Sequence, residues 1–274
     1  MPALYAHLRF GEEVSKTLPA PLQDLVKKYP EAFALGTQGP DILFYHHPLK
    51  KNEIRKYGTE LHEKTAFEVF SAAGEKRTDE PSAYNAYLCG FLCHFTLDLF
   101  CHPYIDQTMN DKVTHGKIES EFDKFLLRKD GKPIRGYNTA TPIKDENGTR
   151  EAAALLLGVP QENIAVAIKT MKKINGWFSK KCELFHTFVH ALLRLANMER
   201  KFGDMFLHKK DDSLCETPNR VLEEKFGNAI APARELITAY FNEVNADGKP
   251  TLSDPVFEKY FRYDFSGNKP TEEF

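Results

Sequence analysis

Hydrophobic residues recur at the spacing of α-helices along most of the chain, and no segment shows the alternation of a half-buried strand. We expect Thr59 to cap a helix that carries His62 in its first turn. We expect Pro103 to end the central helix near Cys101. The expected helices cover about 22–29, 59–73, 81–101, 115–128, 149–157, 162–178, 181–207 and 231–244. The pattern therefore predicts an all-α protein.

Segments that lack this periodicity divide the chain. An irregular loop is expected from Gly36 through Pro48, and the turn-forming residues of 129–148 predict a surface loop. We expect a single domain over residues 1–274. Its parts are a ligand-rich half at 1–128, the loop at 129–148, supporting helices at 149–247 and an irregular tail at 248–274.

The most apolar segment carries polar side chains of the kind that bind metals. His94 and Asp98 are four residues apart and share one face of a helix, and His102 stays within reach of that face. A carboxylate buried in hydrocarbon is costly unless it is paired, protonated or bound to a cation. No Lys or Arg occurs between Ala83 and Asp111, so Asp98 needs a partner from elsewhere, and a metal ion would supply one.

A second histidine–acid pair, His115 and Glu119, follows at the same helical spacing. Seven of the ten histidines lie in the first 115 residues, His7 and His62 among them, and a Gly-Pro-Asp segment occupies 39–41. Zinc takes imidazole nitrogen and carboxylate oxygen as ligands at ~2.0–2.2 Å. The combination of these groups predicts a metal centre, although no single pair does.

Other interpretations stay open for individual residues, because any one histidine is more often a structural residue than a ligand. Asp106 follows His102 by four residues and is a spare candidate ligand. His46 and His47 suit a surface or a substrate-contacting role, and the pair His186 and His190 favours helix packing.

Composition narrows the class of protein. The chain is 42% hydrophobic and 28% charged, which is typical of globular proteins, and its formal net charge of −2 gives no argument for nucleic acid or for strong attraction to anionic membranes. The N-terminal residues lack a signal-peptide pattern, and the apolar run at 86–101 is too short to span a bilayer. Five cysteines are an odd number and favour reduced thiols. We expect a cytoplasmic protein with at most peripheral membrane contact.

The order of the candidate ligands resembles the bacterial zinc-dependent phospholipase C family, and it is similar to the fungal and plant zinc nucleases that share its fold. The resemblance covers about residues 1–125. It implies an α-helical domain with an interior cluster of up to three zinc ions. The residues that carry it are, in chain order, His7, Gly39-Pro40-Asp41, His62, His94-x-x-x-Asp98, His102 and His115-x-x-x-Glu119.

The resemblance also implies a ligand set for each of the three ions. One ion would be held by Asp41, His62, His94 and Asp98. Asp98 would bridge to a second ion, held by His7 and the N-terminus of the chain. A third would be held by His102, His115 and Glu119.

The N-terminal ligand departs from the family, in which a tryptophan exposed by removal of a signal peptide supplies its amine and carbonyl. This chain begins Met-Pro, and methionine is readily removed before a small residue. Our hypothesis is that Pro2, five residues before His7, completes that zinc site through its amine and carbonyl.

The chemistry that follows is hydrolysis of phosphodiesters, because zinc lowers the pKa of a bound water toward ~7. Asp41 would either bind zinc or deprotonate the attacking water as the catalytic residue. Phe44, Tyr45 and Tyr57 are candidates for an apolar substrate wall or for core packing. A phospholipase C-like enzyme acting on phospholipid or another phosphodiester is the leading interpretation.

Two alternatives stay open. One is a zinc nuclease or small-molecule phosphodiesterase, although a nuclease is expected to show a basic groove with stacking aromatics, and we expect no nucleic-acid partner. The other is a non-catalytic protein in which the zinc cluster only stabilises the fold. The sequence leaves the substrate, the number of zinc ions and the oligomeric state open.

Overall fold

The computed structural model describes residues 4–195, 203 and 210–269, and over these residues the chain is helical, with no strand. The predicted all-α fold is therefore confirmed. The elements are α1 (Leu4–Thr17), α2 (Ala20–Lys28), α3 (Pro30–Gly36), the 3₁₀ helix η1 (Gly39–Tyr45), α4 (Glu53–Glu63), α5 (Ala66–Gly74), α6 (Ala83–Thr108), α7 (His115–Lys129), α8 (Asn147–Leu157), α9 (Gln161–Phe178), α10 (Glu183–Leu195), the 3₁₀ helix η3 (Ser213–Cys215), α12 (Glu216–Asn242) and α13 (Pro255–Tyr260).

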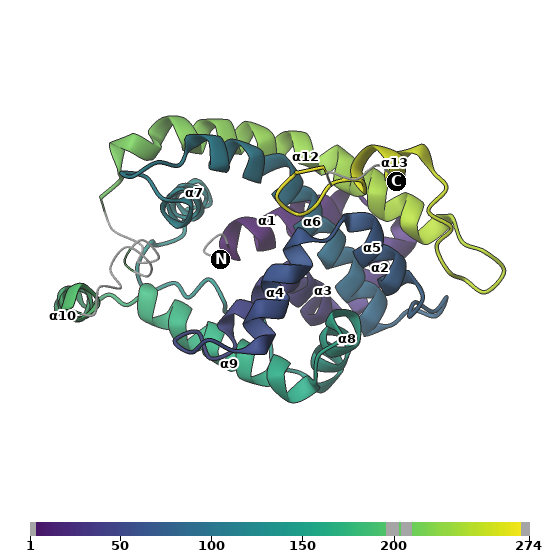
Figure 1. Cartoon of the computed structure of the whole chain (residues 1–274), viewed down its shortest axis with the longest axis horizontal. Coiled ribbons are helices and arrows are strands. Elements are labelled where there is room, and N and C mark those ends of the chain that lie inside the picture. Colours follow the sequence, from purple (N-terminus) through teal and green to yellow (C-terminus); the bar gives the residue numbers. More distant parts are fainter. Residues whose placement is uncertain (1–3, 196–202, 204–209, 270–274) are drawn as a thin grey trace.

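Helix α6 forms the centre of the molecule, with α12 on one side and α3 and α8 on another (Figure 1). The side chain of Ser82 accepts a hydrogen bond from the backbone N–H of Asn85 and so fixes where the helix begins. Apolar residues such as Phe91 and Phe95 occur around the whole circumference and are fully buried. A helix that is apolar on all sides has to be covered on all sides, which explains its position.

By length and composition alone, α6 could cross a membrane, but 72% of its most apolar window is buried inside the structure. Helices α8 and α9 are long and apolar enough to cross a membrane only when they are counted as one span, and they meet at a bend of 113°. The buried core helix of a globular domain can be equally long and apolar, and α6 is packed inside the structure as such a core helix is.

Close backbone contact between α3 and α6 depends on glycine. A Cβ atom on Gly90 would collide with the carbonyl oxygen of Phe33, and one on Gly36 would collide with the carbonyl oxygen of Tyr87. The two helices therefore cross with their backbones touching. This contact brings the residue after α3, Thr37, against His94 of α6.

The expected end of the central helix was wrong, because α6 continues through Pro103 to Thr108. Proline removes one backbone hydrogen bond from a helix interior. Burial of Cys101 and Ile105 on either side of it offsets that loss. As a result, His102 stays on the helix and faces the same side as Asp98.

The expected helix from Thr59 was also wrong. Two helices cover the segment, since Asn52 caps α4 and Thr65 caps α5 in a reciprocal arrangement with Glu68. His62 consequently lies in the last turn of α4 rather than in a first turn.

Several other boundaries differ from the sequence-based expectations. Asp41 lies in the 3₁₀ helix η1 rather than in an irregular loop, and the last long helix begins at Glu216 instead of residue 231. Helices α1, α3 and α13 were not predicted, and α13 lies in the tail that was expected to be irregular. Of the helix expected at 181–207, the structure describes α10 up to Leu195, and most of the remainder lies outside the described residues.

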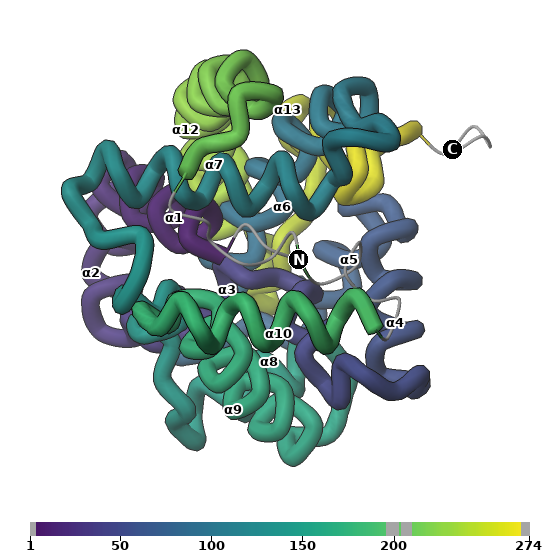
Figure 2. Tube along the Cα trace, turned by 90° about the vertical axis from the view of Figure 1, so that its left-hand side faces the viewer, coloured from purple at the N-terminus to yellow at the C-terminus, as the bar shows by residue number. Residues whose placement is uncertain are grey.

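Helices from the C-terminal part of the chain complete the core. Helix α12 packs against α6 as well as against α1 and α7, and it lies above them in Figure 1. Helix α10 has a different position, because it crosses one face of the molecule at its periphery (Figure 2).

Candidate metal centre

The predicted ligands that the structure describes come together in one cluster. They reach it from the first turns of α1 and α7, from η1, from the end of α4 and from the middle of α6. The ligand atoms form three groups, and within each group they lie no more than 4.8 Å from one another. These groups are His7 with Asp41 and His94, His62 with His94 and Asp98, and His102 with His115 and Glu119.

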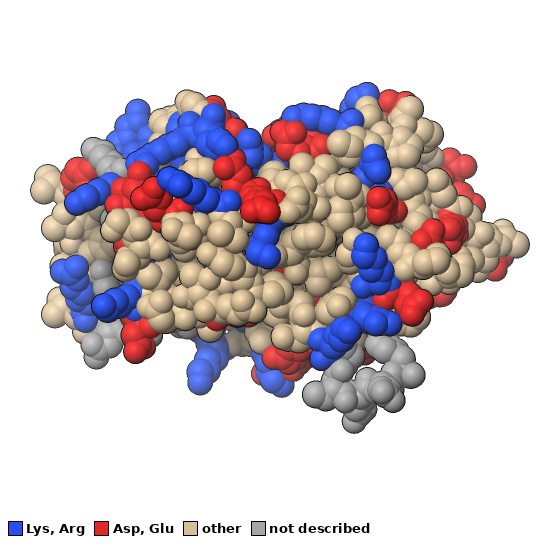
Figure 3. Space-filling view, turned by 90° about the horizontal axis from the view of Figure 1, so that it is seen from above, with Lys and Arg blue, Asp and Glu red and all other residues tan. Residues whose placement is uncertain are grey.

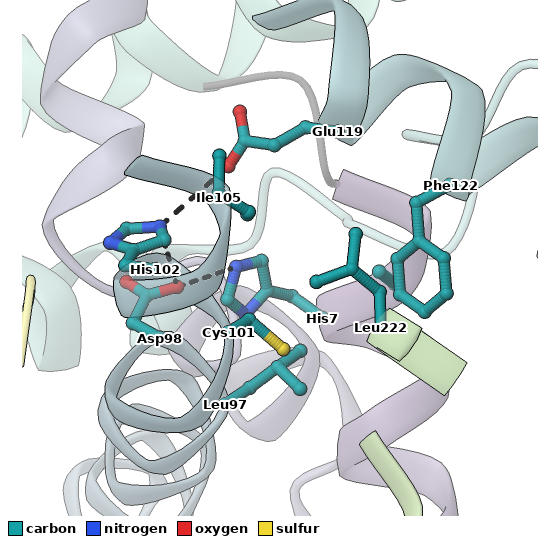
Figure 4. A pocket seen from close by; sticks show the side chains of 10 residues that line it. His7, Leu97, Asp98, Cys101, His102, Ile105, Glu119, Phe122 and Leu222 are labelled. Carbon is teal, nitrogen blue, oxygen red and sulfur yellow. Dashed lines mark ion pairs between the residues drawn. The ribbon is translucent and has the colours of Figure 1, made fainter. Parts of the chain in front are cut away.

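Asp98 lies at the centre of this cluster and faces three histidines. Its Oδ1 atom is 3.2 Å from Nε2 of His7 and 3.4 Å from Nε2 of His102 (Figure 4). Its Oδ2 atom is 3.0 Å from Nε2 of His94. The two carboxylate oxygens thus point toward different imidazoles, which is the arrangement that the bridging role requires.

Glu119 faces two histidines, as Asp98 faces three, and it lies on the other side of His102. Its Oε1 atom lies 3.3 Å from Nε2 of His115 and 3.7 Å from Nε2 of His102. In Figure 4 its side chain points toward His102 from above the Asp98 carboxylate. Glu119 and Asp98 therefore bracket one imidazole between two carboxylates.

Asp41 and His62 form a partly exposed edge of the cluster. Oδ1 of Asp41 is 3.1 Å from Nε2 of His62, and the Asp41 side chain is 19% exposed, against 4% for Asp98. Burial raises the pKa of Asp41, but the hydrogen bond and positive charge of His62 act against burial, and the pKa lies below its ordinary value. The carboxylate is ionised at neutral pH.

The second nitrogen of three of these histidines faces a protein oxygen. Nδ1 of His94 lies 3.2 Å from the carbonyl oxygen of Thr37, and Nδ1 of His62 lies 2.7 Å from that of Gly58. Nδ1 of His115 lies 3.1 Å from Oδ1 of Asp106. Outer oxygens of this kind fix the tautomer and the ring orientation of metal-binding histidines. The inward Nε2 atoms are thereby left with their lone pairs facing the cluster.

The ionisable groups show how strongly the cluster concentrates charge. Burial lowers the pKa of His94, which favours its neutral form. Burial also lowers the pKa of His102, but the charges of Asp98 and Glu119 outweigh it and raise the value to about 9. Burial raises the pKa of Asp98, yet the neighbouring imidazoles outweigh it and hold the value far below the usual range. The buried carboxylates of Asp98 and Glu119 therefore stabilise positive charge inside the protein.

The chemistry of these donors fits zinc. His7, His94, Asp98 and Glu119 are all buried, so their charges and lone pairs must be satisfied within the protein. Nε2 of His94 makes no hydrogen bond although Oδ2 of Asp98 lies 3.0 Å away, so a buried lone pair is available to a cation. A cavity of about 20 Å³, enough for one water or ion, is lined by His7, Asp98, His102 and Glu119 and by apolar side chains. Imidazole nitrogen and carboxylate oxygen are preferred zinc ligands.

Asp123 is a contributor that the sequence analysis missed. Its buried carboxylate accepts hydrogen bonds from the backbone N–H groups of Tyr5, at 3.0 Å, and Ala6, at 2.8 Å, and it thereby holds the start of α1 and positions His7. Burial raises its pKa to about 7 despite these two donors. The signal was available, because Asp123 follows Glu119 by four residues on the same buried face.

Other predicted residues lie apart from the cluster. Nδ1 of His46 is 3.2 Å from Oδ1 of Asn52, the residue that caps α4. His186 is buried in α10, where its Nε2 lies 2.8 Å from the carbonyl oxygen of Lys180. Pro2 lies outside the described residues, so its ligand role stays a prediction.

Residues 6–169 match the family model described as zinc dependent phospholipase C. This match covers more than half of the chain and includes every residue of the three candidate groups. No curated protein and no solved structure matches the chain.

Proposed function

Because the chain belongs to the zinc-dependent phospholipase C family, we propose that it is a hydrolase that cleaves the phosphodiester bond of a phospholipid. The observation that carries the proposal is the convergence of distant histidines on the two oxygens of Asp98. Bound zinc would supply Lewis acidity, which lowers the pKa of a coordinated water and polarises the phosphoryl group. His7, His62, His94, Asp98, His102, His115 and Glu119 would hold it.

Asp41 is the residue we assign to proton transfer. Its side chain is ionised and reachable by solvent, whereas the carboxylate of Asp98 is enclosed by three imidazoles. A general base has to lie within hydrogen-bond reach of the water that it deprotonates. His62, held by the carbonyl oxygen of Gly58, keeps the Asp41 carboxylate oriented toward the cluster.

Aromatic residues near the cluster divide between the site and the core. The ring of Phe44 stacks on His62 with centroids 5.3 Å apart, so it lies where a headgroup would contact the cluster. Tyr45 is buried, and its hydroxyl oxygen accepts a hydrogen bond from the side-chain amide of Asn175. Phe44 therefore suits the substrate wall, while Tyr45 packs in the core.

The charges around α7, which carries His115 and Glu119, favour a phospholipid over a nucleic acid as the substrate. On the face shown in Figure 3, Lys and Arg side chains are interspersed with Asp and Glu. Lys117 and Arg128 of α7, for example, pair with Asp212 and Asp211. A nuclease needs unpaired positive charge along a groove.

Accessibility favours catalysis over a purely structural zinc cluster. A structural site is closed by protein ligands, whereas a catalytic site keeps a position open. The side chains of His62, His102 and His115 remain partly exposed at the edge of the cluster. Substrate can therefore reach this edge.

The cytoplasmic location stays a prediction. All five cysteines are free, and four of them are buried. Reduced thiols are expected in the cytoplasm, and this expectation is the support for that location.

The test is elemental analysis of the protein together with turnover of p-nitrophenyl phosphorylcholine and bis-p-nitrophenyl phosphate. We expect bound zinc and faster hydrolysis of the phosphorylcholine ester. Zinc without turnover of either ester would support the structural alternative. Preference for bis-p-nitrophenyl phosphate, together with cleavage of single-stranded DNA, would support the nuclease.

A further inference from the structure

Helix α10 presents an apolar stripe to solvent. Leu184, Phe188, Leu192 and Leu195 are 81%, 63%, 48% and 84% exposed. Their spacing of four, four and three residues places them on one face of the helix. Figure 1 shows α10 end-on at the edge of the molecule, and Figure 2 shows it running across that face. Among the described helices, none packs extensively against it.

The opposite side of α10 is attached to the rest of the protein. His186 is buried there, with Nε2 close to the carbonyl oxygen of Lys180. Glu183 in the first turn pairs with Arg135, at 3.0 Å, in the loop that follows α7. The helix is therefore held in place while its apolar stripe faces outward.

A basic segment leads into this helix. No Asp or Glu occurs between Glu162 and Glu183, and the interval contains five lysines. Four of them are exposed, and none of the four pairs with a carboxylate within the described part of the chain. These are Lys169, Lys173, Lys180 and Lys181.

Two aromatic rings contact lysines of this segment. Trp177, the one tryptophan of the chain, is 43% exposed at the end of α9, and Nζ of Lys173 lies 4.9 Å from the centre of its ring. Nζ of Lys180 lies 4.2 Å from the centre of the Phe185 ring. Amphipathic rings and long cationic side chains of this kind favour the boundary between water and lipid.

We propose that α10 and the C-terminal end of α9 form a surface that docks on a bilayer containing anionic lipid. The apolar stripe would enter the boundary between headgroups and acyl chains, and the exposed lysines would contact the anionic headgroups. The inference rests on the proposed function, because a phospholipid substrate has to be reached in its bilayer.

A second copy of the chain fits this surface less well. In a symmetric dimer the same patch faces itself, so the exposed lysines of one copy would approach those of the other. An anionic bilayer removes that repulsion and covers the apolar stripe at the same time.

The experiment is cosedimentation of the full chain with vesicles of phosphatidylcholine, with and without phosphatidylglycerol. We expect binding to the mixed vesicles, a shift of Trp177 fluorescence to shorter wavelength, and weaker binding in high salt because salt screens the lysines. The double variant Leu184→Gln, Leu195→Gln should bind at least about tenfold more weakly, because two leucines lose their transfer from water. Both residues are so exposed that the fold should not depend on them.

The matched control is Leu155→Gln, an exposed leucine on α8 outside this surface. It should bind like the wild type. Lys173→Gln combined with Lys180→Gln should reduce binding to the mixed vesicles alone. Wild-type binding by the leucine double variant would overturn the proposal, as would failure of the wild type to bind mixed vesicles. A lipid-free dimer that the leucine double variant converts to monomer, without vesicle binding, would also overturn it.

Turnover of p-nitrophenyl phosphorylcholine without vesicles separates this inference from the proposed function. The leucine double variant should keep wild-type turnover of this soluble ester. Normal turnover without vesicle binding rejects the docking surface and keeps the hydrolase. Vesicle binding that depends on the stripe, without turnover, keeps the docking surface and rejects the hydrolase.

Discussion

Helix α6 carries charged and polar side chains into the interior, whereas α10 carries large apolar side chains to the surface. On α6, Asp98 and His94 lie among fully buried aromatic residues. On α10, Leu184 and Leu195 lie in water. Both helices depart from the usual pattern of polar outside and apolar inside. Each departure indicates a component that the chain does not itself provide, which we infer to be a cation for α6 and a lipid surface for α10.

The largest expected effect comes from removing the central charge of the interior region. Asp98→Asn keeps the size of the side chain but removes its charge, so we expect a loss of zinc and a fall in turnover of roughly a thousandfold or more. Turnover of p-nitrophenyl phosphorylcholine and elemental analysis measure the two effects. Asp247→Asn, on an exposed turn, is the matched control. Normal zinc content and turnover in the Asp98 variant would mean that the interior polar groups have another purpose.

The pH dependence of the zinc-free protein sharpens the same comparison. The pKa of His102 is raised to about 9 in the fold, so its protonated form stabilises the folded state. That contribution is full below pH ~6.5, the unfolded value, and is lost as the pH rises through ~9. Urea denaturation of the zinc-free protein should give a free energy of unfolding that is about 3 kcal/mol lower above pH 9 than at pH 6.

In the zinc-loaded protein this dependence should disappear, because metal binding requires the deprotonated imidazole. An equal pH dependence with and without zinc would place His102 outside the metal centre.

A glycine substitution tests whether the interior region is as tightly fixed as its contacts indicate. Gly90→Ala would place a methyl group against the carbonyl oxygen of Phe33, and we expect it to cost about 1–3 kcal/mol of stability. Gly227→Ala, in α12, meets no atom within 4 Å and should stabilise the helix by about 0.5–1 kcal/mol. Thermal denaturation compares the two. Equal effects would show that α3 and α6 can separate without penalty.

The smallest effect is expected at Asp106, which contacts Nδ1 of His115 rather than a metal. Loss of such an outer oxygen typically weakens metal binding about 10- to 100-fold. Asp106→Ala should therefore lose zinc to a chelator more readily, and Asp106→Asn, which retains an acceptor oxygen, should lie between it and the wild type. If both variants keep wild-type affinity, the His115–Asp106 contact is a surface pair only.

The sequence predicted the candidate ligands that lie together better than it predicted the helices that carry them. Spacing identified His94 with Asp98 and His115 with Glu119, because i,i+4 pairs share a face regardless of where a helix ends. The ligand roles of His7, Asp41 and His62 came only from the family resemblance. Boundaries failed where tertiary packing overrode local signals, as at Pro103, which the buried core around α6 tolerates. Thr59 failed as a cap because Asn52, seven residues earlier, provides a better one.

Some features could not be inferred from spacing. Every residue has a backbone carbonyl oxygen, so the sequence does not indicate which of them contact histidines. Only the fold shows that those of Thr37 and Gly58 orient His94 and His62. The lysines before α10 were hidden by the balanced net charge of −2, which averages over the whole chain. Local charge along one surface can differ greatly from that average.

The central claim is that Asp98 and its surrounding histidines hold zinc. Anomalous diffraction at the zinc edge, from crystals of the native protein, tests it most directly. We predict peaks beside the Asp98 carboxylate, with imidazole nitrogens at ~2.0–2.1 Å. Zinc-soaked crystals with no peak near Asp98 would contradict the account.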